Sequence, residues 1–328
     1  VAVIGPLGAT GEIHGSWHCG GKAEETVSVL EGLKNLLGDK VKYAKGCSIE
    51  YDSIDESFFD EACELAKTSE CVVLCIGEHQ EYSGEGNCRT NIDLPEIQYK
   101  LLDRILAVNK NVAVALFTGR PLAISRLDKT APAILNMWMP GTEGGNACAS
   151  LLFGDSVPSG KITMTFPRAL GQCPIYYNHY TTGRPKALED DEKFVRFTSC
   201  FLDMPNSPLY PFGYGLSYTT FQYSNLEIVK EDGYKARFDI TNTGLVAGCE
   251  IAQLYISDPV ATVPKPLKEL KKFLKVELQP NETKTVTIEI DEQDLAYYNV
   301  SLHRWVAEDG RYQVLIGSSS QDIRLTGS

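Results

Sequence analysis

The sequence predicts two globular parts, a layered α/β domain with a mostly parallel sheet between helices and, after it, an all-β sandwich. In the first half, short apolar runs rich in β-branched residues alternate with helical patterns, which is typical of parallel strands buried on both faces. In about the last 100 residues, short strands with alternating apolar and polar residues are separated by turn signals. The 328 residues are also enough for two domains.

The elements of the α/β domain follow one another along the chain. Buried strands are predicted at residues 1–5, 41–44, 71–76, 112–117 and 133–139, and an edge strand at 161–166. Helices are predicted at residues 22–37, 58–67, 96–108 and 144–153. Residues from about 168 to 216 have little regular pattern, and we expect an irregular linker there.

From residue 221 onward the pattern changes to short alternating strands. They are predicted at residues 234–240, 250–256, 274–278, 285–290 and 312–316. Strands of this kind, with turns between them, are typical of an immunoglobulin-like or fibronectin type III-like sandwich. We therefore place one domain at residues 1–210 and a second at residues 211–328.

The amino-acid composition limits which molecules the protein could bind and in which cell compartment it is expected. The net charge of −12 argues against nucleic acid and against an anionic membrane surface, because both need clustered Lys and Arg. No apolar stretch reaches the about 18 residues of a membrane-spanning helix. Ten cysteines without a regular framework predict reduced thiols and a cytoplasmic protein. Paired C-x-x-C motifs and the G-x-G-x-x-G spacing are both absent, so neither a metal nor a nucleotide cofactor is expected.

The candidate site is the polar loop at residues 77–90, which follows the third buried strand. In open α/β sheets, ligands bind outside the carboxyl ends of the strands. The loop carries Glu78, Glu81 and Glu85, and a carboxylate held between rigid elements suits general acid catalysis. Glu81 and Glu85 by themselves are not expected to form a catalytic pair, because both would be exposed on one segment.

Several segments together resemble glycoside hydrolase family 3, in the same order along nearly the whole chain. They are VIGP at 3–6, GSW at 15–17, GEH at 77–79, SGEG at 83–86, LP at 94–95, PG at 140–141, GG at 144–145, LLFG at 151–154, PSGKITMTFP at 158–167 and YPFGYGLSY at 210–218. The last segment resembles the family's entry into a fibronectin type III-like domain.

The resemblance implies a retaining β-glucosidase or related exo-acting glycosidase, whose substrate is a β-glucoside or an oligosaccharide. In that family the nucleophile is an aspartate on a (β/α)₈ barrel, which needs about 200 residues or more. This chain has no room for one, so the barrel domain is an expected partner. The chain starts inside a predicted strand without a methionine, and we expect residues upstream to be missing. The alternative is a non-catalytic carbohydrate-binding or assembly module, and the oligomeric state, a homo-oligomer included, stays open.

By the resemblance, Glu85 is the general acid/base, whereas the residues alone would favour a solvated loop glutamate. The flanking Gly84 and Gly86 leave room for a sugar to approach the backbone. Glu78, directly at the strand end, is expected to be structural and to accept backbone N–H groups. Arg89 is expected to fix the loop by pairing with a nearby carboxylate, such as that of Asp93 or of Glu85 itself.

Two aromatic residues are candidates for substrate binding. Trp17 could stack on the apolar face of a sugar, and the equal alternative is a packed residue that caps the sheet. Tyr82 lies next to the loop's key residues and is a candidate hydrogen-bond partner of the substrate, with an ordinary surface tyrosine as the alternative.

Overall fold

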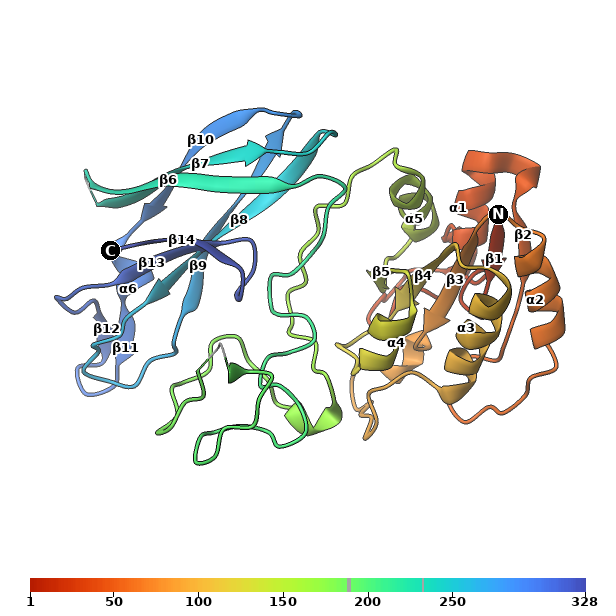
Figure 1. Cartoon of the computed structure of the whole chain (residues 1–328), viewed down its shortest axis with the longest axis horizontal. Coiled ribbons are helices and arrows are strands. Elements are labelled where there is room, and N and C mark those ends of the chain that lie inside the picture. The colour runs from red at the N-terminus through yellow and green to blue at the C-terminus, as the bar shows by residue number, and fades with distance from the viewer. Residues whose placement is uncertain (188–189, 232) are drawn as a thin grey trace. The chain divides into compact units, whose positions relative to one another are not determined.

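The computed structural model describes residues 1–187, 190–231 and 233–328, which form two compact units. Unit 1 comprises residues 1–156 and 167–171, and unit 2 comprises residues 157–166 and 172–328. Figure 1 labels the helices and strands of both. The bounds of these units differ from those of the domains proposed at residues 1–210 and 211–328. Those domain limits stay a prediction. No helix in the described ranges is both long and apolar enough to cross a membrane.

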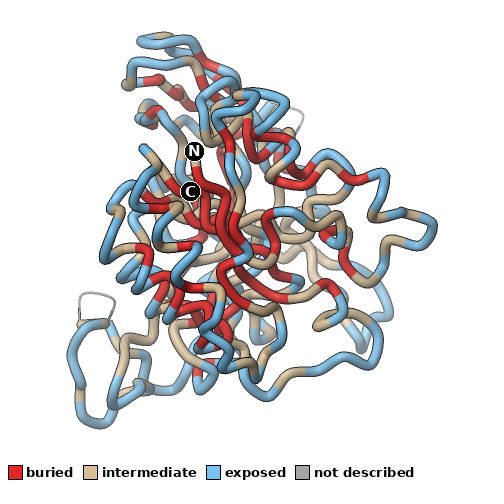
Figure 2. The backbone as a smooth tube through the Cα atoms, turned by 90° about the vertical axis from the view of Figure 1, so that its right-hand side faces the viewer, coloured by how far each residue is buried: buried red, intermediate tan, exposed pale blue. Residues whose placement is uncertain are grey.

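Unit 1 is built on a five-stranded parallel sheet with the order β2-β1-β3-β4-β5. Its strands are β1 (Ala2–Ile4), β2 (Lys42–Ala44), β3 (Val72–Gly77), β4 (Val112–Phe117) and β5 (Ala133–Trp138). β3 is the central strand, and all of its residues are buried. Figure 2 shows the buried segments in red along the tube.

The longer helices of unit 1 pack in two pairs. One pair is α1 (Val29–Leu37) and α5 (Gly144–Phe153), and the other is α2 (Phe59–Lys67) and α3 (Glu96–Val108). Side chains of the first pair share one hydrophobic core with Val73 and Cys75 of β3. Since successive strand residues point to opposite faces, Leu74 and Ile76 point to the other face of the sheet. The predicted α/β fold, with a mostly parallel sheet between helices, is confirmed (Figure 1).

The helix predicted at residues 22–37 begins later in the structure. Residues Ala23–Glu25 form a separate 3₁₀ turn, and α1 starts at Val29. The reason is a capping box at Ser28: its hydroxyl accepts from the Glu31 N–H (3.2 Å), and the Glu31 carboxylate accepts from the Ser28 N–H (2.9 Å). A short helix, α4 (Ser125–Thr130), was not predicted.

The prediction of an edge strand at residues 161–166 is wrong. This segment belongs to unit 2, and it makes only scattered backbone pairs with residues 210–214. The Ile162 N–H donates to the Tyr214 carbonyl oxygen (2.9 Å), and the Phe166 N–H donates to that of Tyr210 (2.9 Å). Between these bonds the chain bends at Thr163 and Met164, so no regular ladder forms.

Unit 2 contains an antiparallel β-sandwich. A three-stranded sheet has the order β10-β7-β6, a four-stranded sheet has the order β14-β13-β8-β9, and β11 pairs with β12 in a separate hairpin. The bounds are β6 (Phe221–Lys230), β7 (Tyr234–Asn242), β8 (Gly248–Ser257), β9 (Glu269–Leu278), β10 (Thr283–Ile290), β11 (Tyr297–Asn299), β12 (Arg304–Val306), β13 (Gln313–Gly317) and β14 (Ile323–Gly327), with a short helix α6 (Glu292–Leu295).

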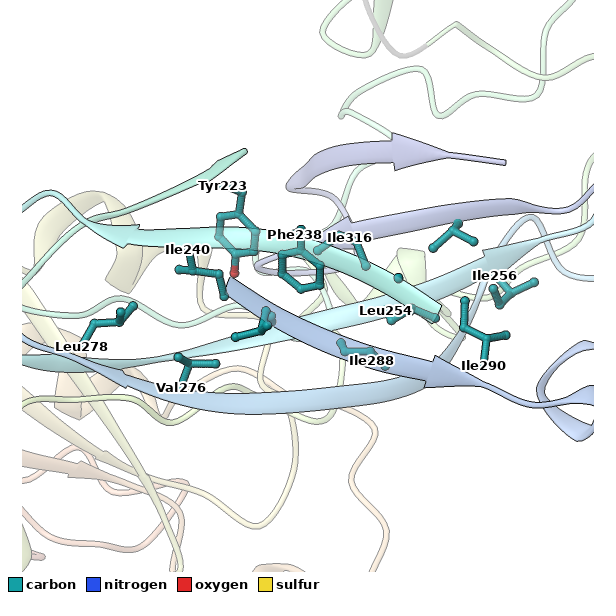
Figure 3. Packing of buried hydrophobic residues seen from close by; sticks show 14 residues of the cluster. Tyr223, Phe238, Ile240, Leu254, Ile256, Val276, Leu278, Ile288, Ile290 and Ile316 are labelled. Atoms are coloured by element: carbon teal, nitrogen blue, oxygen red, sulfur yellow. The ribbon is translucent and has the colours of Figure 1, made fainter. Parts of the chain in front are cut away.

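The core of this sandwich lies between its two larger sheets. Phe238 and Ile240 of β7, Leu254 of β8 and Ile316 of β13 are all fully buried in it (Figure 3). They occupy alternate strand positions, which is the pattern that predicted the strands. The predicted fibronectin type III-like sandwich is confirmed.

Candidate active site

Strand β3 brings the candidate loop to the carboxyl edge of the parallel sheet. It ends at Gly77, whose N–H donates to the side-chain oxygen of Gln98 (2.9 Å), and the Gln98 amide donates back to the Gly77 carbonyl oxygen (2.9 Å). Gln98 is fully buried on α3. Gly77 has a φ of 142°, and a side chain there would overlap Phe117 of β4. The base of the loop is therefore fixed from both sides.

Glu78, the first residue after β3, is a carboxylate with only 1% exposure. One oxygen lies 2.8 Å from the Thr118 hydroxyl and 3.3 Å from the Gly119 N–H, and it accepts from both. The other oxygen forms ion pairs with Arg89 and, at 3.3 Å, with Nε of Arg120. Burying a carboxylate is costly unless it is paired in this way, so Glu78 anchors the groups around it.

Arg89 is the loop's own contribution to this ion pair. Arg89 pairs with a nearby carboxylate, as expected, but that carboxylate is Glu78 and not the side chain of Asp93 or Glu85. Arg89 meets Asp93 through the backbone, because Nη2 donates to the Asp93 carbonyl oxygen (3.1 Å). The guanidinium also lies over the ring of Tyr51, 4.4 Å from its centre. Arg89 thus ties together the two ends of the segment that contains Glu85.

A second loop packs against the first. The Ser16 hydroxyl lies within hydrogen-bond distance of the carbonyl oxygens of Gln80 and Ser83 and can donate to either. Gly84 sits so close to it that an added Cβ would lie 2.6 Å from the Ser16 Cβ and 3.6 Å from Nε1 of Trp17. The structure therefore brings Trp17 next to the Glu85 segment, which the sequence spacing alone did not reveal.

Glu85 is exposed and lies at the outer part of this loop. Gly84 precedes it with a φ of 117°, and Gly86 follows it with a φ of 76°. These conformations suit glycine and turn the backbone on both sides of the carboxylate. A cleft of about 480 Å³ lies along this loop; its lining includes Glu81, Gly86 and Arg89 but not Glu85. The loop can thus present one carboxylate to a ligand without a bulky neighbour on either side.

The two aromatic candidates differ in their surroundings. Tyr82 is half-buried, its hydroxyl oxygen accepts from the Tyr51 N–H (3.3 Å), and its O–H donates to the Glu50 carboxylate (3.4 Å). Burial raises the pKa of Tyr82. The Trp17 side chain is 67% exposed, so its ring is open to a ligand. Substrate binding by either residue stays a prediction.

The sequence reasoning missed Ser16, Thr118 and Arg120. The last two follow β4, and Phe117 at the end of that strand lies beside Gly77 at the end of β3. Polar residues directly after a neighbouring buried strand reach the same edge of a parallel sheet, so their position was the available signal. Ser16 directly precedes Trp17, but nothing in its spacing indicated the contact with residues 80 and 83.

No group of three or more His, Cys, Asp or Glu residues among those described could hold a metal ion. The ten cysteines are all free. Burial raises the pKa of the Cys47 and Cys148 thiols to about 12.

Curated relatives match almost the whole chain. A periplasmic beta-glucosidase of Salmonella typhimurium is 41% identical over 99% of this chain, which corresponds to 45% of the relative. A beta-xylosidase of Formosa agariphila is 40% identical over 90% of this chain and 40% of the relative. The chain thus spans less than half the length of these relatives.

Solved structures match as well. The beta-glucosidase of Listeria innocua in complex with isofagomine has a TM-score of 0.91 and 38% identity, covering 99% of this chain and 45% of that one. The GH3 beta-glucosidase of Bifidobacterium adolescentis has a TM-score of 0.83 at 30% identity, covering 99% of this chain and 48% of that one.

Two family models match the chain, one for the α/β domain and, after it, one for the β-sandwich. Residues 1–218 match the C-terminal domain of glycosyl hydrolase family 3, and residues 250–320 match the fibronectin type III-like domain. The first match covers the parallel sheet and the Glu85 loop, and the second covers most of the β-sandwich. The chain belongs to glycosyl hydrolase family 3.

Proposed function

We propose that this chain is part of a retaining β-glucosidase and supplies its general acid/base, Glu85. The observation that carries the proposal is the placement of Glu85, an exposed carboxylate between two glycines on a loop fixed at the carboxyl edge of a parallel sheet. The nucleophilic aspartate would lie on a barrel domain outside this chain. The substrate would be a β-glucoside or an oligosaccharide with a terminal, non-reducing β-D-glucosyl residue.

The other two glutamates of the loop are poorer candidates. Glu78 is buried against Arg89 and Arg120, and no substrate oxygen could reach it without breaking these ion pairs. Glu81 lies in a 3₁₀ turn, where its N–H donates to the Nδ1 atom of His79 (3.2 Å). Glycines flank only Glu85 among the three. Gly84 makes room for Ser16, and Gly86 has open space beside it that a sugar could enter.

The relatives support glucose as the sugar. Proteins named beta-glucosidase from Salmonella typhimurium and Listeria innocua each match 99% of this chain, and the Listeria structures include a complex with glucose. In a retaining mechanism, a carboxylic acid first protonates the leaving oxygen while the nucleophile forms a covalent glycosyl-enzyme. The same group, now a carboxylate, then takes a proton from the water that releases the sugar.

The proposal is tested by Glu85→Ala in the complete enzyme, with Glu81→Ala as the matched control. We expect turnover of substrates with poor leaving groups to fall by about 10²-fold or more in Glu85→Ala, because general acid catalysis is worth about that much. On an activated substrate such as dinitrophenyl glucoside, breakdown of the glycosyl-enzyme limits turnover once the base is lost. Added azide should restore part of the rate there and yield β-glucosyl azide, since azide attacks the glycosyl-enzyme without needing a base. Unchanged turnover in Glu85→Ala would refute the assignment.

A further inference from the structure

Arg120 joins the buried carboxylate of unit 1 to the loop that carries Glu85. Its Nε lies 3.3 Å from the Glu78 carboxylate, and Nη2 donates to the carbonyl oxygen of Tyr82. Its own backbone is held by Thr118, whose hydroxyl oxygen accepts from the Arg120 N–H (3.1 Å). The Arg120 side chain is only 20% exposed. These contacts place a rigid, permanently charged group between the sheet edge and the start of the loop.

The contacts of Arg120 and Arg89 lie on opposite sides of Glu85 in the sequence. Arg120 holds the carbonyl of Tyr82, three residues before Glu85, and Arg89 lies four residues after it. Both guanidinium groups pair with the same oxygen of Glu78. One buried carboxylate therefore fixes both ends of the segment through two arginines. The intervening glycines, which have no side chain to pack, would otherwise leave the position of Glu85 loosely defined.

We propose that Arg120 is a positioning residue for the acid/base Glu85, acting through the Tyr82 carbonyl and the shared Glu78 carboxylate. The inference rests on the proposed function of Glu85. A proton donor must lie within hydrogen-bond reach of the leaving oxygen, and a displacement of about 1 Å can cost on the order of 10²-fold in rate. Arg120 touches neither substrate nor reacting atoms in this role.

A positioning role can be told from a general loss of enzyme stability by how the rate depends on the leaving group. A leaving group such as dinitrophenolate departs without protonation, whereas an alkoxide or a phenolate needs the proton. Loss of the correct Glu85 position should therefore slow poor leaving groups most and activated ones least. A general loss of folded enzyme would lower the rates of all substrates by the same factor.

The test measures kcat/KM of the complete enzyme for aryl β-glucosides from dinitrophenyl to phenyl. We expect Arg120→Met to lose about 10- to 100-fold on phenyl glucoside and less than about threefold on dinitrophenyl glucoside. Arg120→Lys keeps the charge beside Glu78, but its single nitrogen cannot replace both Nε at Glu78 and Nη2 at the Tyr82 carbonyl oxygen. It should therefore show the same trend with normal folding. Arg126→Met, which removes an arginine paired with Glu96 and Asp103 on the helices, is the control and should leave the trend unchanged.

Glu85→Ala in the same substrate series separates the two hypotheses. If Glu85→Ala shows no dependence on the leaving group, the acid/base assignment itself fails. If it does, but Arg120→Lys loses the same factor on every substrate or loses nothing, the positioning role is overturned. Should Arg120→Met fail to fold, as circular dichroism would reveal, the Lys variant alone decides.

Discussion

At the residue scale, the two glycines beside Glu85 have different roles. Gly84 has a φ of 117° and faces Ser16, so a side chain there would be strained and would also collide with the neighbouring loop. Gly86 has a φ of 76°, but an added Cβ would point into open space. The first glycine allows the two loops to pack, whereas the second only allows the backbone to turn.

Alanine at each position separates these roles. We expect Gly84→Ala to displace the loop and to lower kcat on poor leaving groups by about 10-fold or more, because the acid would no longer reach the leaving oxygen. Gly86→Ala should cost about 1–2 kcal/mol of local strain and change kcat much less. The measurement is steady-state kinetics of both variants of the complete enzyme. Equal losses in the two variants would contradict the packing role of Gly84.

At the element scale, the N-terminal cap fixes where helix α1 begins. Ser28 and Glu31 form the reciprocal hydrogen bonds of a capping box. The backbone hydrogen bond from Ser28, followed by the one from its side chain, lowers the pKa of Glu31. The apolar spacing within residues 22–37 suggested a longer helix, but the Ser28 side chain caps the first N–H groups, so the helix begins at Val29.

The capping box should stabilise unit 1 in a pH-dependent way. Ser28→Ala should cost about 1 kcal/mol in the free energy of unfolding at pH 7. Since the folded pKa of Glu31 lies below its unfolded value of about 4.3, its carboxylate contributes stability above that pH and loses it as the pH falls through the lowered pKa.

The check is urea unfolding followed by tryptophan fluorescence, comparing the wild-type chain with Glu31→Gln at pH 7 and near pH 3. The difference in stability should be clear at pH 7 and should shrink towards zero at the lower pH. Glu24→Gln, which changes an exposed glutamate outside α1, is the matched control. A difference that grows as the pH falls would mean that Glu31 does not act through its charged form.

At the scale of the whole molecule, the chain covers less than half the length of its relatives. Each of its two units has its own hydrophobic core, so both have the burial that a folded unit needs. The loop exposes two carboxylates, Glu81 and Glu85, but both lie on one exposed segment, whereas a retaining glycosidase places its two carboxyl groups about 5–5.5 Å apart on either side of the scissile bond. Under the proposed function, the second carboxylate is the aspartate of a barrel domain outside this chain.

The isolated chain should consequently fold but show no glycosidase activity on aryl β-glucosides. Adding the barrel domain, as a separate chain or as part of one polypeptide, should restore turnover, and the same addition to the Glu85→Ala chain should not. Binding of glucose or isofagomine to the isolated chain, with no hydrolysis under any complementation, would instead favour the non-catalytic carbohydrate-binding alternative. A cytoplasmic location stays a prediction, which fractionation of the source cells would test.

The sequence by itself determined the element types and the position of the Glu85 loop. Short apolar runs such as residues 112–117 alternate with helical patterns along the chain. This local pattern is enough to predict a buried parallel sheet with a loop at its carboxyl edge. The order of the motifs indicated the family, and the alternation in residues 234–240 indicated the second sandwich.

Only the tertiary structure decided which residues meet around that loop. Glu78 pairs with Arg120, 42 positions away, and Ser16 reaches Ser83 across 67 positions. Whether residues 161–166 form an edge strand depends in the same way on the segment they pair with. They pair with residues 210–214 and not with the parallel sheet. Local period depends on neighbours in the sequence, whereas charge pairing and strand pairing depend on which distant segments the packed core brings within about 3 Å.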